Sequence, residues 1–251
     1  HTVTGVVTGK PVHLGGSLGR VKATGRGVFI TGYEIAKKIG LSLDGAKVSV
    51  QGFGNVGSEA ANLFSEYKSK IVCIQDHTGT IFNADGIDLE GLHAHVAATQ
   101  GVLGFAGAKQ IDNEDFWDVE TDIIIPAALE GQITIERAKR LKAKMILEGA
   151  NGPTYPEADD ILVGRDIVVV PDVICNAGGV TVSYFEWVQD MSSFFWTEDE
   201  INERLDKLMI QAVADVWNCA ADNKCTMRTA AYILACERIL RARKERGIYP
   251  G

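Results

Sequence analysis

A glycine-rich turn at residues 52–57, G-F-G-N-V-G, sets the strongest limit on how this 251-residue chain folds. It follows a short stretch at 47–51 that predicts a strand, and it precedes a stretch at 58–67 that predicts a helix. In this context the spacing G-x-G-x-x-G is typical of dinucleotide binding. Gly52 permits a tight turn, Gly54 lets the backbone approach a pyrophosphate, and Gly57 lets the helix pack on the strand. The alternative is a plain βα turn whose glycines serve only helix packing.

Short apolar segments recur along the chain and alternate with helical patterns. Further buried strands are predicted at residues 71–75, 123–125, 145–147 and 167–170. Helices are predicted at 26–39, ending before Gly40, and at 136–141, while the first 20 residues predict irregular or extended structure. Strands that are apolar on both faces are typical of a parallel sheet covered by helices on either side. The sequence therefore predicts an α/β fold, with a doubly wound, Rossmann-type, mainly parallel sheet.

The last 55 residues of the chain predict a C-terminal helical segment. Thr197 has Glu200 three positions later, which is the spacing of a capping box, and apolar residues then follow at helical spacing. A second helix is predicted at 227–246, and it ends in a basic turn before Gly247, as the helix dipole favours. We interpret that basic cluster as helix-end electrostatics rather than as a phosphate site. The predicted division is residues 1–196, a nucleotide-binding domain with an N-terminal lead-in, and residues 197–251, helices that pack on it or beside it.

Composition excludes several classes of partner. With 25 Lys and Arg against 33 Asp and Glu, the net charge is −8, which argues against binding to nucleic acid or an anionic membrane. No apolar run is long enough to span a membrane. The five cysteines form no C-x-x-C motif, so we expect buried or half-buried thiols in a reducing compartment. His93 and His95 lack further ligands at metal-binding spacing, so we interpret them as packing or surface residues and predict no metal site.

An acidic residue follows the second predicted strand. Asp76 lies 24 residues after Gly52, where a carboxylate accepts hydrogen bonds from the adenosine ribose and repels a 2′-phosphate. Because residues 75–80 contain no Lys or Arg, the sequence favours NAD over NADP. His77, when protonated, would soften that repulsion. The alternative is that Asp76 only shapes the turn at residues 76–79.

Longer motifs lie outside the glycine turn, at residues 8–11 (TGKP), 15–20 (GGSLGR), 23–28 (ATGRGV), 148–154 (EGANGPT) and 171–187 (PDVICNAGGVTVSYFEW). Together with VQGFGNVG at 50–57, they resemble in order the nucleotide-binding part of the glutamate dehydrogenases, within the Glu/Leu/Phe/Val dehydrogenase family. The two C-terminal helices fit as well, so the resemblance covers essentially the whole chain. Leucine and phenylalanine dehydrogenases share the architecture but resemble the chain less at 23–28 and at 186–189 (EWVQ). They remain the alternative.

The resemblance implies a role for each matched position of the cofactor site. It places Thr24 at the nicotinamide carboxamide, Phe53, Gly54, Asn55 and Val56 along the pyrophosphate, Asp76 at the adenosine ribose, Ala127 and Ala128 on the adenosine side, Asn151 and Asn176 at the nicotinamide and its ribose, and Ser183 at a substrate carboxylate. Without the resemblance, Thr24 reads as a helix cap, the two asparagines as turn residues and Ser183 as a surface residue.

The activity implied is the reversible, NAD(P)-dependent oxidative deamination of L-glutamate to 2-oxoglutarate and ammonia. In the family, proton transfer falls to a lysine in a glycine-rich loop and to an aspartate, both in an N-terminal substrate domain. The chain shows no such loop, and Lys10, in TGKP, is not its equivalent. We therefore expect no catalytic residue in this chain and place the lysine and aspartate upstream of His1. The chain is expected to bind cofactor without turnover.

The resemblance also implies an assembly and a compartment. The full-length enzyme is expected to be a homohexamer in the cytoplasm, with the mitochondrial matrix as the alternative. A rival of another class is a non-catalytic nucleotide-sensing module, which would equally bind dinucleotide without turnover.

Overall fold

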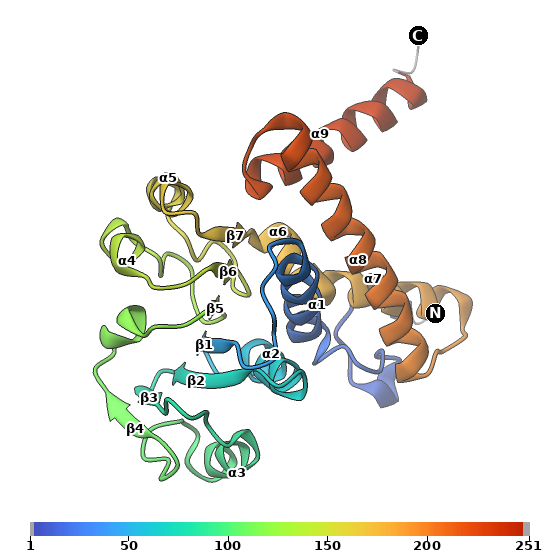
Figure 1. The fold of residues 1–251 in the computed structure, drawn as a ribbon. Helices are drawn as coiled ribbons and strands as arrows, with labels where there is room; N and C mark the ends of the chain where they lie inside the picture. Colours follow the sequence, from blue (N-terminus) through green and yellow to red (C-terminus); the bar gives the residue numbers. More distant parts are fainter. Residues whose placement is uncertain (1–2, 248–251) are drawn as a thin grey trace.

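The computed structural model describes residues 3–247, so the expectation attached to His1 and the end of the predicted C-terminal segment, 248–251, lie outside them. Seven strands form one sheet in the order β4-β3-β2-β1-β5-β6-β7 (Figure 1). The strands are β1 (Lys47–Gln51), β2 (Lys70–Gln75), β3 (Thr80–Phe82), β4 (Lys109–Ile111), β5 (Ile123–Pro126), β6 (Met145–Leu147) and β7 (Val168–Val170). Strands β2, β1, β5, β6 and β7 run parallel, whereas β3 pairs antiparallel with β2 and β4 pairs antiparallel with β3. The predicted Rossmann-type, mainly parallel sheet is confirmed.

Helices cover both faces of the sheet. They are α1 (Ala23–Lys38), α2 (Asn55–Glu66), α3 (Leu89–Thr99), α4 (Ile135–Arg140), α5 (Pro156–Gly164), α6 (Asp172–Cys175), α7 (Ala177–Ser192), α8 (Glu198–Asn223) and α9 (Met227–Arg246). Alternate residues of β5 show the two layers. Ile123 and Ile125 pack in the cluster that holds α1, α2, α7 and α8, whereas Ile124 packs with Trp117, α4 and α5. Both faces are therefore buried, which explains why β5, β6 and β7 are apolar at every position.

Several predicted boundaries are wrong by a few residues, and some elements were not predicted. Helix α1 begins at Ala23 rather than at 26, and α2 begins at Asn55 rather than at 58, because their first turns contain glycine and polar residues that hide the apolar spacing. Residues 4–6 and 12–14 form short 3-10 turns in the lead-in predicted to be irregular or extended. Strands β3 and β4 have three residues each, too short to show a period.

Helices α1 and α7 cross with their backbones in close contact. A Cβ atom on Gly178 would lie 2.2 Å from the carbonyl oxygen of Ala23, and one on Gly27 would lie 2.9 Å from the backbone nitrogen of Gly178. Only glycine allows the two helices to approach this closely. As a result, the first turn of α1 and the first two turns of α7 form neighbouring walls of the same space.

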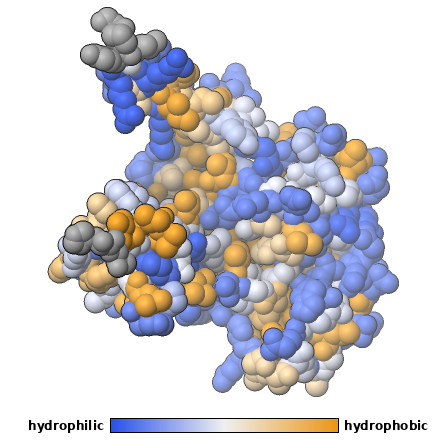
Figure 2. All heavy atoms as spheres, turned by 180° about the vertical axis from the view of Figure 1, so that it is seen from behind, coloured by the Kyte–Doolittle hydropathy of each residue, from blue (hydrophilic) through white to orange (hydrophobic). Residues whose placement is uncertain are grey.

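The C-terminal helices continue the same core. Thr197 accepts a hydrogen bond from the Glu200 backbone and Glu200 returns one, which confirms the predicted capping box. Leu205 and Val213 of α8 and Ala230 of α9 lie in the cluster that includes α1. The second half of α9 is exposed and projects from the body (Figure 1). Apolar side chains gather in patches on the reverse face (Figure 2). Val6 and Leu14 of the lead-in, and Met191, Phe194 and Phe195 at the end of α7 and just after it, are all more than half exposed.

Candidate functional site

Two clefts of about 790 and 780 Å³ open at the carboxyl ends of the parallel strands. Both are lined by Ala127, Ala128 and Leu129, which follow β5, so they meet at this loop. Strands β2 and β5 flank β1 on opposite sides, and the order of connection reverses here. In doubly wound sheets ligands bind at such a switch point. We call the cleft over β1 and β2 the first cleft and the cleft between α1 and α7 the second cleft.

The first cleft is lined by the glycine turn and by Asp76. Residues 52–54 of the turn lie along it. The Asp76 carboxylate accepts hydrogen bonds from the backbone N–H of Thr78 at 2.7 Å, the Thr78 hydroxyl at 2.5 Å and the backbone N–H of Val102 at 3.0 Å. Its side chain is only 10% exposed, with His77 Nδ1 3.8 Å away. Asp76 thus shapes its turn, as the alternative interpretation held, and also places a carboxylate in the cleft wall.

Beneath the first cleft lies a chain of amide side chains that the sequence reasoning missed. Gln51 Nε2 donates to Gln75 Oε1 at 2.9 Å and to Gln132 Oε1 at 2.8 Å, and Gln75 Nε2 donates to the Thr80 hydroxyl at 2.8 Å. The Gln51 Oε1 atom is buried without a hydrogen-bond partner in the structure. The available signal was the presence of glutamine at the carboxyl ends of two neighbouring strands, where an apolar residue would otherwise be expected.

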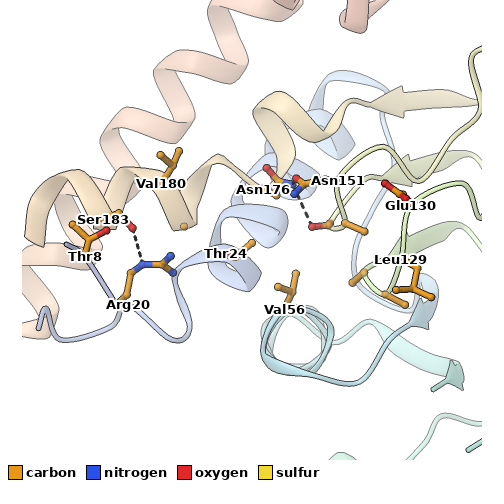
Figure 3. Close-up of a pocket in the computed structure, with 15 residues that line it drawn as sticks. Thr8, Arg20, Thr24, Val56, Leu129, Glu130, Asn151, Asn176, Val180 and Ser183 are labelled. Carbon is orange, nitrogen blue, oxygen red and sulfur yellow. Dashed lines mark hydrogen bonds between the residues drawn. The ribbon is translucent and has the colours of Figure 1, made fainter. Parts of the chain in front are cut away.

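The second cleft brings together predicted residues from four segments (Figure 3). Thr24 of α1, Val56 of α2, Asn151 after β6, and Asn176 and Ser183 at α7 all line it. Asn176 Nδ2 donates to Asn151 Oδ1 at 2.7 Å. The helix-cap reading of Thr24 is wrong, because the residue before α1 is Lys22 and no side chain caps it. The asparagines do occupy turn or helix-end positions, and they face the cleft as well.

Arg20 is a residue of the second cleft that the sequence reasoning missed. Its Nε atom donates to the Ser183 hydroxyl at 2.8 Å, and the pair lies at one end of the cleft in Figure 3, with Leu129 at the other. Ser183 is therefore half-buried and engaged rather than a plain surface residue. A guanidinium beside a hydroxyl offers the donors that a carboxylate needs. The signal was an arginine at the end of the GGSLGR stretch, directly before α1.

The residues of the glycine turn differ in how they meet the two clefts. Asn55 and Gly57 line neither cleft. Phe53 is 8% exposed, with its ring 5.2 Å from that of His93, so it lines the first cleft from a largely buried position. Gly57 is buried, and a Cβ there would lie 1.8 Å from the Gly52 carbonyl oxygen. The predicted packing role of Gly57 thus has a direct structural basis, whereas contacts of these residues with a cofactor stay predictions.

The lead-in that carries Arg20 is fixed to α7 by an ion-pair cluster. Lys10 Nζ lies 2.6 Å from Glu186 Oε1 and 2.7 Å from Asp190 Oδ2, and the Glu186 side chain is fully buried. Burial alone would raise the pKa of Glu186, but hydrogen bonds from the Lys10 side chain and from the backbone of Gly9 and Lys10 hold it below its usual value. Because its amine is committed to this cluster, Lys10 has a structural role and does not reach into either cleft.

The histidines, cysteines and long helices of residues 3–247 can be compared with the predictions made for them. These residues contain no group of three or more His, Cys, Asp or Glu side chains placed to hold a metal ion. His93 bonds to Asn62 and His95 to the Leu103 carbonyl, as packing residues do. Within the same part of the chain, no helix combines the length and apolar character that crossing a membrane requires. The five cysteines are unpaired, and one of them, Cys236, is exposed, contrary to the predicted burial.

Comparison with known proteins agrees with this geometry. Residues 15–247 match the Glutamate/Leucine/Phenylalanine/Valine dehydrogenase family. The chain belongs to this family. It is 51% identical over its full length to a glutamate dehydrogenase of Thermotoga maritima, covering 60% of that protein, and 44% identical over 98% of its length to an NAD-specific glutamate dehydrogenase of Clostridioides difficile, covering 59%. The predicted resemblance is therefore confirmed, and the chain spans about three fifths of the length of these curated relatives.

A solved structure agrees with the fold as well. The hetero-hexameric glutamate dehydrogenase of Thermus thermophilus, in a leucine-bound form, superposes with a TM-score of 0.93 at 36% identity. The match covers 99% of this chain and 59% of the Thermus chain. The α/β sheet, the lead-in and the C-terminal helices thus form an arrangement that a known dehydrogenase of this family shares.

Proposed function

We propose that this chain is the dinucleotide-binding part of a glutamate dehydrogenase, which carries out the reversible NAD(P)-dependent oxidative deamination of L-glutamate to 2-oxoglutarate and ammonia. The observation that carries the proposal is the pair of clefts that meet at residues 127–129, with the glycine turn along one and two facing asparagines in the other. Each cleft has a volume suited to half of a dinucleotide. Membership of the family and the relatives named above support the choice of reaction.

The cofactor would lie with its adenosine half in the first cleft and its nicotinamide half in the second. The pyrophosphate would meet the backbone of residues 53–56, where the N-terminus of α2 supplies N–H groups and a partial positive charge. Asp76 would hold the adenosine ribose, and Ala127 and Ala128 would flank the adenosine side. This order follows from the glycine turn, because the pyrophosphate must lie between the two halves.

In the second cleft the nicotinamide would lie among Thr24, Asn151 and Asn176, whose side chains offer donors and acceptors without a fixed charge. The bound cofactor supplies the hydride chemistry, and these residues orient its ring. Ser183, together with Arg20, would bind a substrate carboxylate at the far end of the cleft. The Arg20–Ser183 hydrogen bond supports this role, because it holds two donors toward the same space.

NAD is the preferred cofactor in this proposal, with NADP as the weaker ligand. The Asp76 carboxylate is held by three hydrogen bonds in the wall of the first cleft. A charge fixed there repels a 2′-phosphate, because moving it away would break the turn. The Clostridioides difficile relative, which is NAD-specific, supports the same choice.

The 251-residue chain by itself is proposed to bind cofactor without turnover. Neither lysine nor aspartate is among the residues that line the second cleft in the described part of the chain, so no proton-transfer group of the expected kind faces the nicotinamide. The full-length protein is proposed to act as a hexamer in the cytoplasm. The exposed apolar surface near Leu14 and Phe194 supports a role within a larger assembly, since such a surface is typical of interfaces.

Titration of the purified chain with NADH, followed by the fluorescence of the bound nicotinamide, tests the proposal. We expect saturable binding of NADH, weaker binding of NADPH, and no reduction of NAD in the presence of glutamate. Absence of NADH binding would refute the dinucleotide site, and glutamate-dependent turnover by the chain alone would refute the absence of catalytic residues. A panel of amino acids offered to the full-length enzyme separates glutamate from leucine or phenylalanine, and no activity at all would favour the sensing module.

The carboxylate site is tested by Arg20→Gln in the full-length enzyme. We expect the KM for glutamate to rise by about tenfold or more, because a charged hydrogen bond to the substrate is lost. Arg26→Gln is the matched control, because Arg26 lies only six residues further along, in α1, but pairs with Asp206 of α8 and lines neither cleft. Equal effects of the two substitutions would refute the role of Arg20.

A further inference from the structure

An arginine of the last helix is surrounded by three carboxylates from other parts of the chain. Arg228, near the start of α9, bonds to Glu148 through Nη2 at 2.7 Å and Nη1 at 3.0 Å. It bonds to Asp159 of α5 through Nε at 2.6 Å, and its Nη1 lies 3.8 Å from Asp172 of α6. Glu148 directly follows β6 and its side chain is fully buried, while the Arg228 side chain is 24% exposed. One cation thus joins four separate segments.

This cluster continues into the second cleft through backbone hydrogen bonds. Glu148 Oε2 accepts the backbone N–H of Asp172 at 2.8 Å, and Asp172 Oδ2 accepts the backbone N–H of Gly152 at 2.8 Å. The loop that starts at Glu148 and the helix that starts at Asp172 are therefore tied together at both ends of residues 148–152. Asn151 lies within that loop, and Asn176 caps the C-terminal end of α6.

We propose that Arg228 is a positioning residue, which holds Asn151 and Asn176 at the separation where both can engage the nicotinamide half of the dinucleotide. The proposal rests on the dinucleotide-binding function proposed above. Arg228 itself lines neither cleft, so it acts through the loop and the helix. The 2.7 Å bond between the two asparagines shows the arrangement that the cluster maintains.

The electrostatics of the cluster explain why an arginine is needed. Glu148 is buried, and a buried carboxylate without a cation is strongly destabilised. With Arg228 removed, Glu148, Asp159 and Asp172 would also repel one another, which drives the β6 loop and α6 apart. A lysine restores the charge, but its single ammonium cannot make two-point contacts with both Glu148 and Asp159, as the planar guanidinium does.

The experiment compares two ligands on variants of the 251-residue chain. NADH reports both clefts, whereas ADP reports only the adenosine side, because it lacks the nicotinamide and its ribose. For Arg228→Met we expect the Kd of NADH to rise by about tenfold, equivalent to the loss of one well-made hydrogen bond, and the Kd of ADP to stay within about twofold. Arg228→Lys should restore part of the NADH affinity. The fluorescence change on NADH binding should be largest for the unsubstituted chain, smaller for Arg228→Lys and smallest for Arg228→Met.

Two further variants separate positioning from folding. Asp172→Ala breaks the link to Gly152 while leaving the contacts of Arg228 with Glu148 and Asp159 in place. It therefore tests the positioning of the loop at residues 148–152 even if Arg228→Met does not fold. It should show the same selective loss of NADH affinity. Arg238→Met is the matched control, because Arg238 is on the same helix, 69% exposed, and pairs only with Asp215 among the described residues. It should leave the Kd of NADH and the Kd of ADP unchanged.

The outcomes distinguish this proposal from the one on which it rests. If Arg228→Lys and Asp172→Ala leave NADH affinity unchanged, or if NADH and ADP affinities fall together, the positioning role is overturned while dinucleotide binding stands. If the unsubstituted chain binds neither NADH nor ADP, the proposed function fails and this role fails with it.

Discussion

Two substitutions in the glycine turn, Gly57→Ala and Gly54→Ala, should distinguish the glycine that the packing of α2 requires from the glycine that cofactor binding requires. A Cβ on Gly57 would lie 1.8 Å from the Gly52 carbonyl oxygen and 2.9 Å from Val50 Cγ1, whereas ordinary contact begins at 3.4 Å. The Gly52 carbonyl has little freedom to move, because the Gly52 backbone N–H is bonded to the Gln75 carbonyl at 2.6 Å and a Cβ on Gly52 would lie 2.7 Å from the Ala127 carbonyl oxygen. Helix α2 must therefore shift away from β1.

The cost of that shift can be set against the gain in helix propensity. Overpacking typically costs about 1–3 kcal/mol, and a backbone overlap of this size belongs at the upper end. Replacing a glycine within a helix by alanine returns about 1 kcal/mol. We expect Gly57→Ala to lower the free energy of unfolding by about 2 kcal/mol, which corresponds to a fall of about 4–8 °C in melting temperature for a chain of this size.

Gly54→Ala should behave in the opposite way. A Cβ on Gly54 meets no atom within 4 Å, and its φ of −85° suits any residue. The change at the N-terminal cap of α2 should therefore cost no more than about 1 kcal/mol of stability. The methyl group would, however, stand where a pyrophosphate must approach the backbone, so NADH affinity should fall by about tenfold or more.

Urea unfolding followed by circular dichroism, together with NADH titration of both variants, tests the pair. A Gly57→Ala chain as stable as the unsubstituted one would refute the packing argument. A Gly54→Ala chain that binds NADH with undiminished affinity would refute the path assigned to the pyrophosphate, whatever its stability.

Three further predictions concern single residues. Asp76→Ser should lower the free energy of unfolding by about 1–3 kcal/mol, because three hydrogen bonds to the carboxylate are lost or weakened. It should also narrow the preference for NADH over NADPH. An unchanged ratio of the two dissociation constants in titrations would contradict the role of Asp76 in cofactor choice. Burial raises the pKa of Cys73 to about 12, so a thiol reagent at pH 8 should modify exposed Cys236 quickly and Cys73 only after unfolding, as peptide mapping would show. Since the pKa of Glu186 is held below its usual 4.5, the stability that its pairing with Lys10 adds is present above pH 4.5 and is lost as the pH falls through the lowered pKa. The urea midpoint should therefore fall more steeply below pH 4.5 in the unsubstituted chain than in Glu186→Gln. An equal dependence of the two midpoints on pH would contradict the stabilising role of the Glu186–Lys10 pair.

The sequence predicted the parts of this fold that repeat a local pattern. The strand at 47–51, the glycine turn and the capping box at Thr197 each show their signal within a few residues, and the structure confirms them. Strands β3 and β4 were not predicted, because each has only three residues and includes polar ones, so neither forms an apolar run like β6 or β7. Strand β3 is held by pairing with β2, and β4 by pairing with β3. The start of α1 was misplaced for a related reason, since Thr24 and Gly25 have low helix propensity and are helical through packing.

The residues of the candidate site also fall into those that local sequence indicated and those that it did not. Residues of the glycine turn and Asp76 could be placed from local sequence, while Asn151, Asn176 and Ser183 were placed only through a family resemblance. Arg20 and Arg228 were missed, because what gives each a role is a partner far along the chain: Ser183 for Arg20, and Glu148 for Arg228. Single-sequence patterns carry no information about such pairs.

The second cleft exists because segments on either side of the nucleotide fold in the sequence meet at one helix crossing. Gly27 and Gly178 bring α1 and α7 together, and Thr24 then lies against Gly179, in the first turn of α7. Lys10 then fixes the lead-in to α7, which holds Arg20 against Ser183. The glycine turn alone would bind the pyrophosphate of many dinucleotides. In the proposed function, this crossing is what would suit the site to an amino-acid substrate, because it brings the donors of Arg20 and Ser183 to the far end of the cleft that would hold the nicotinamide.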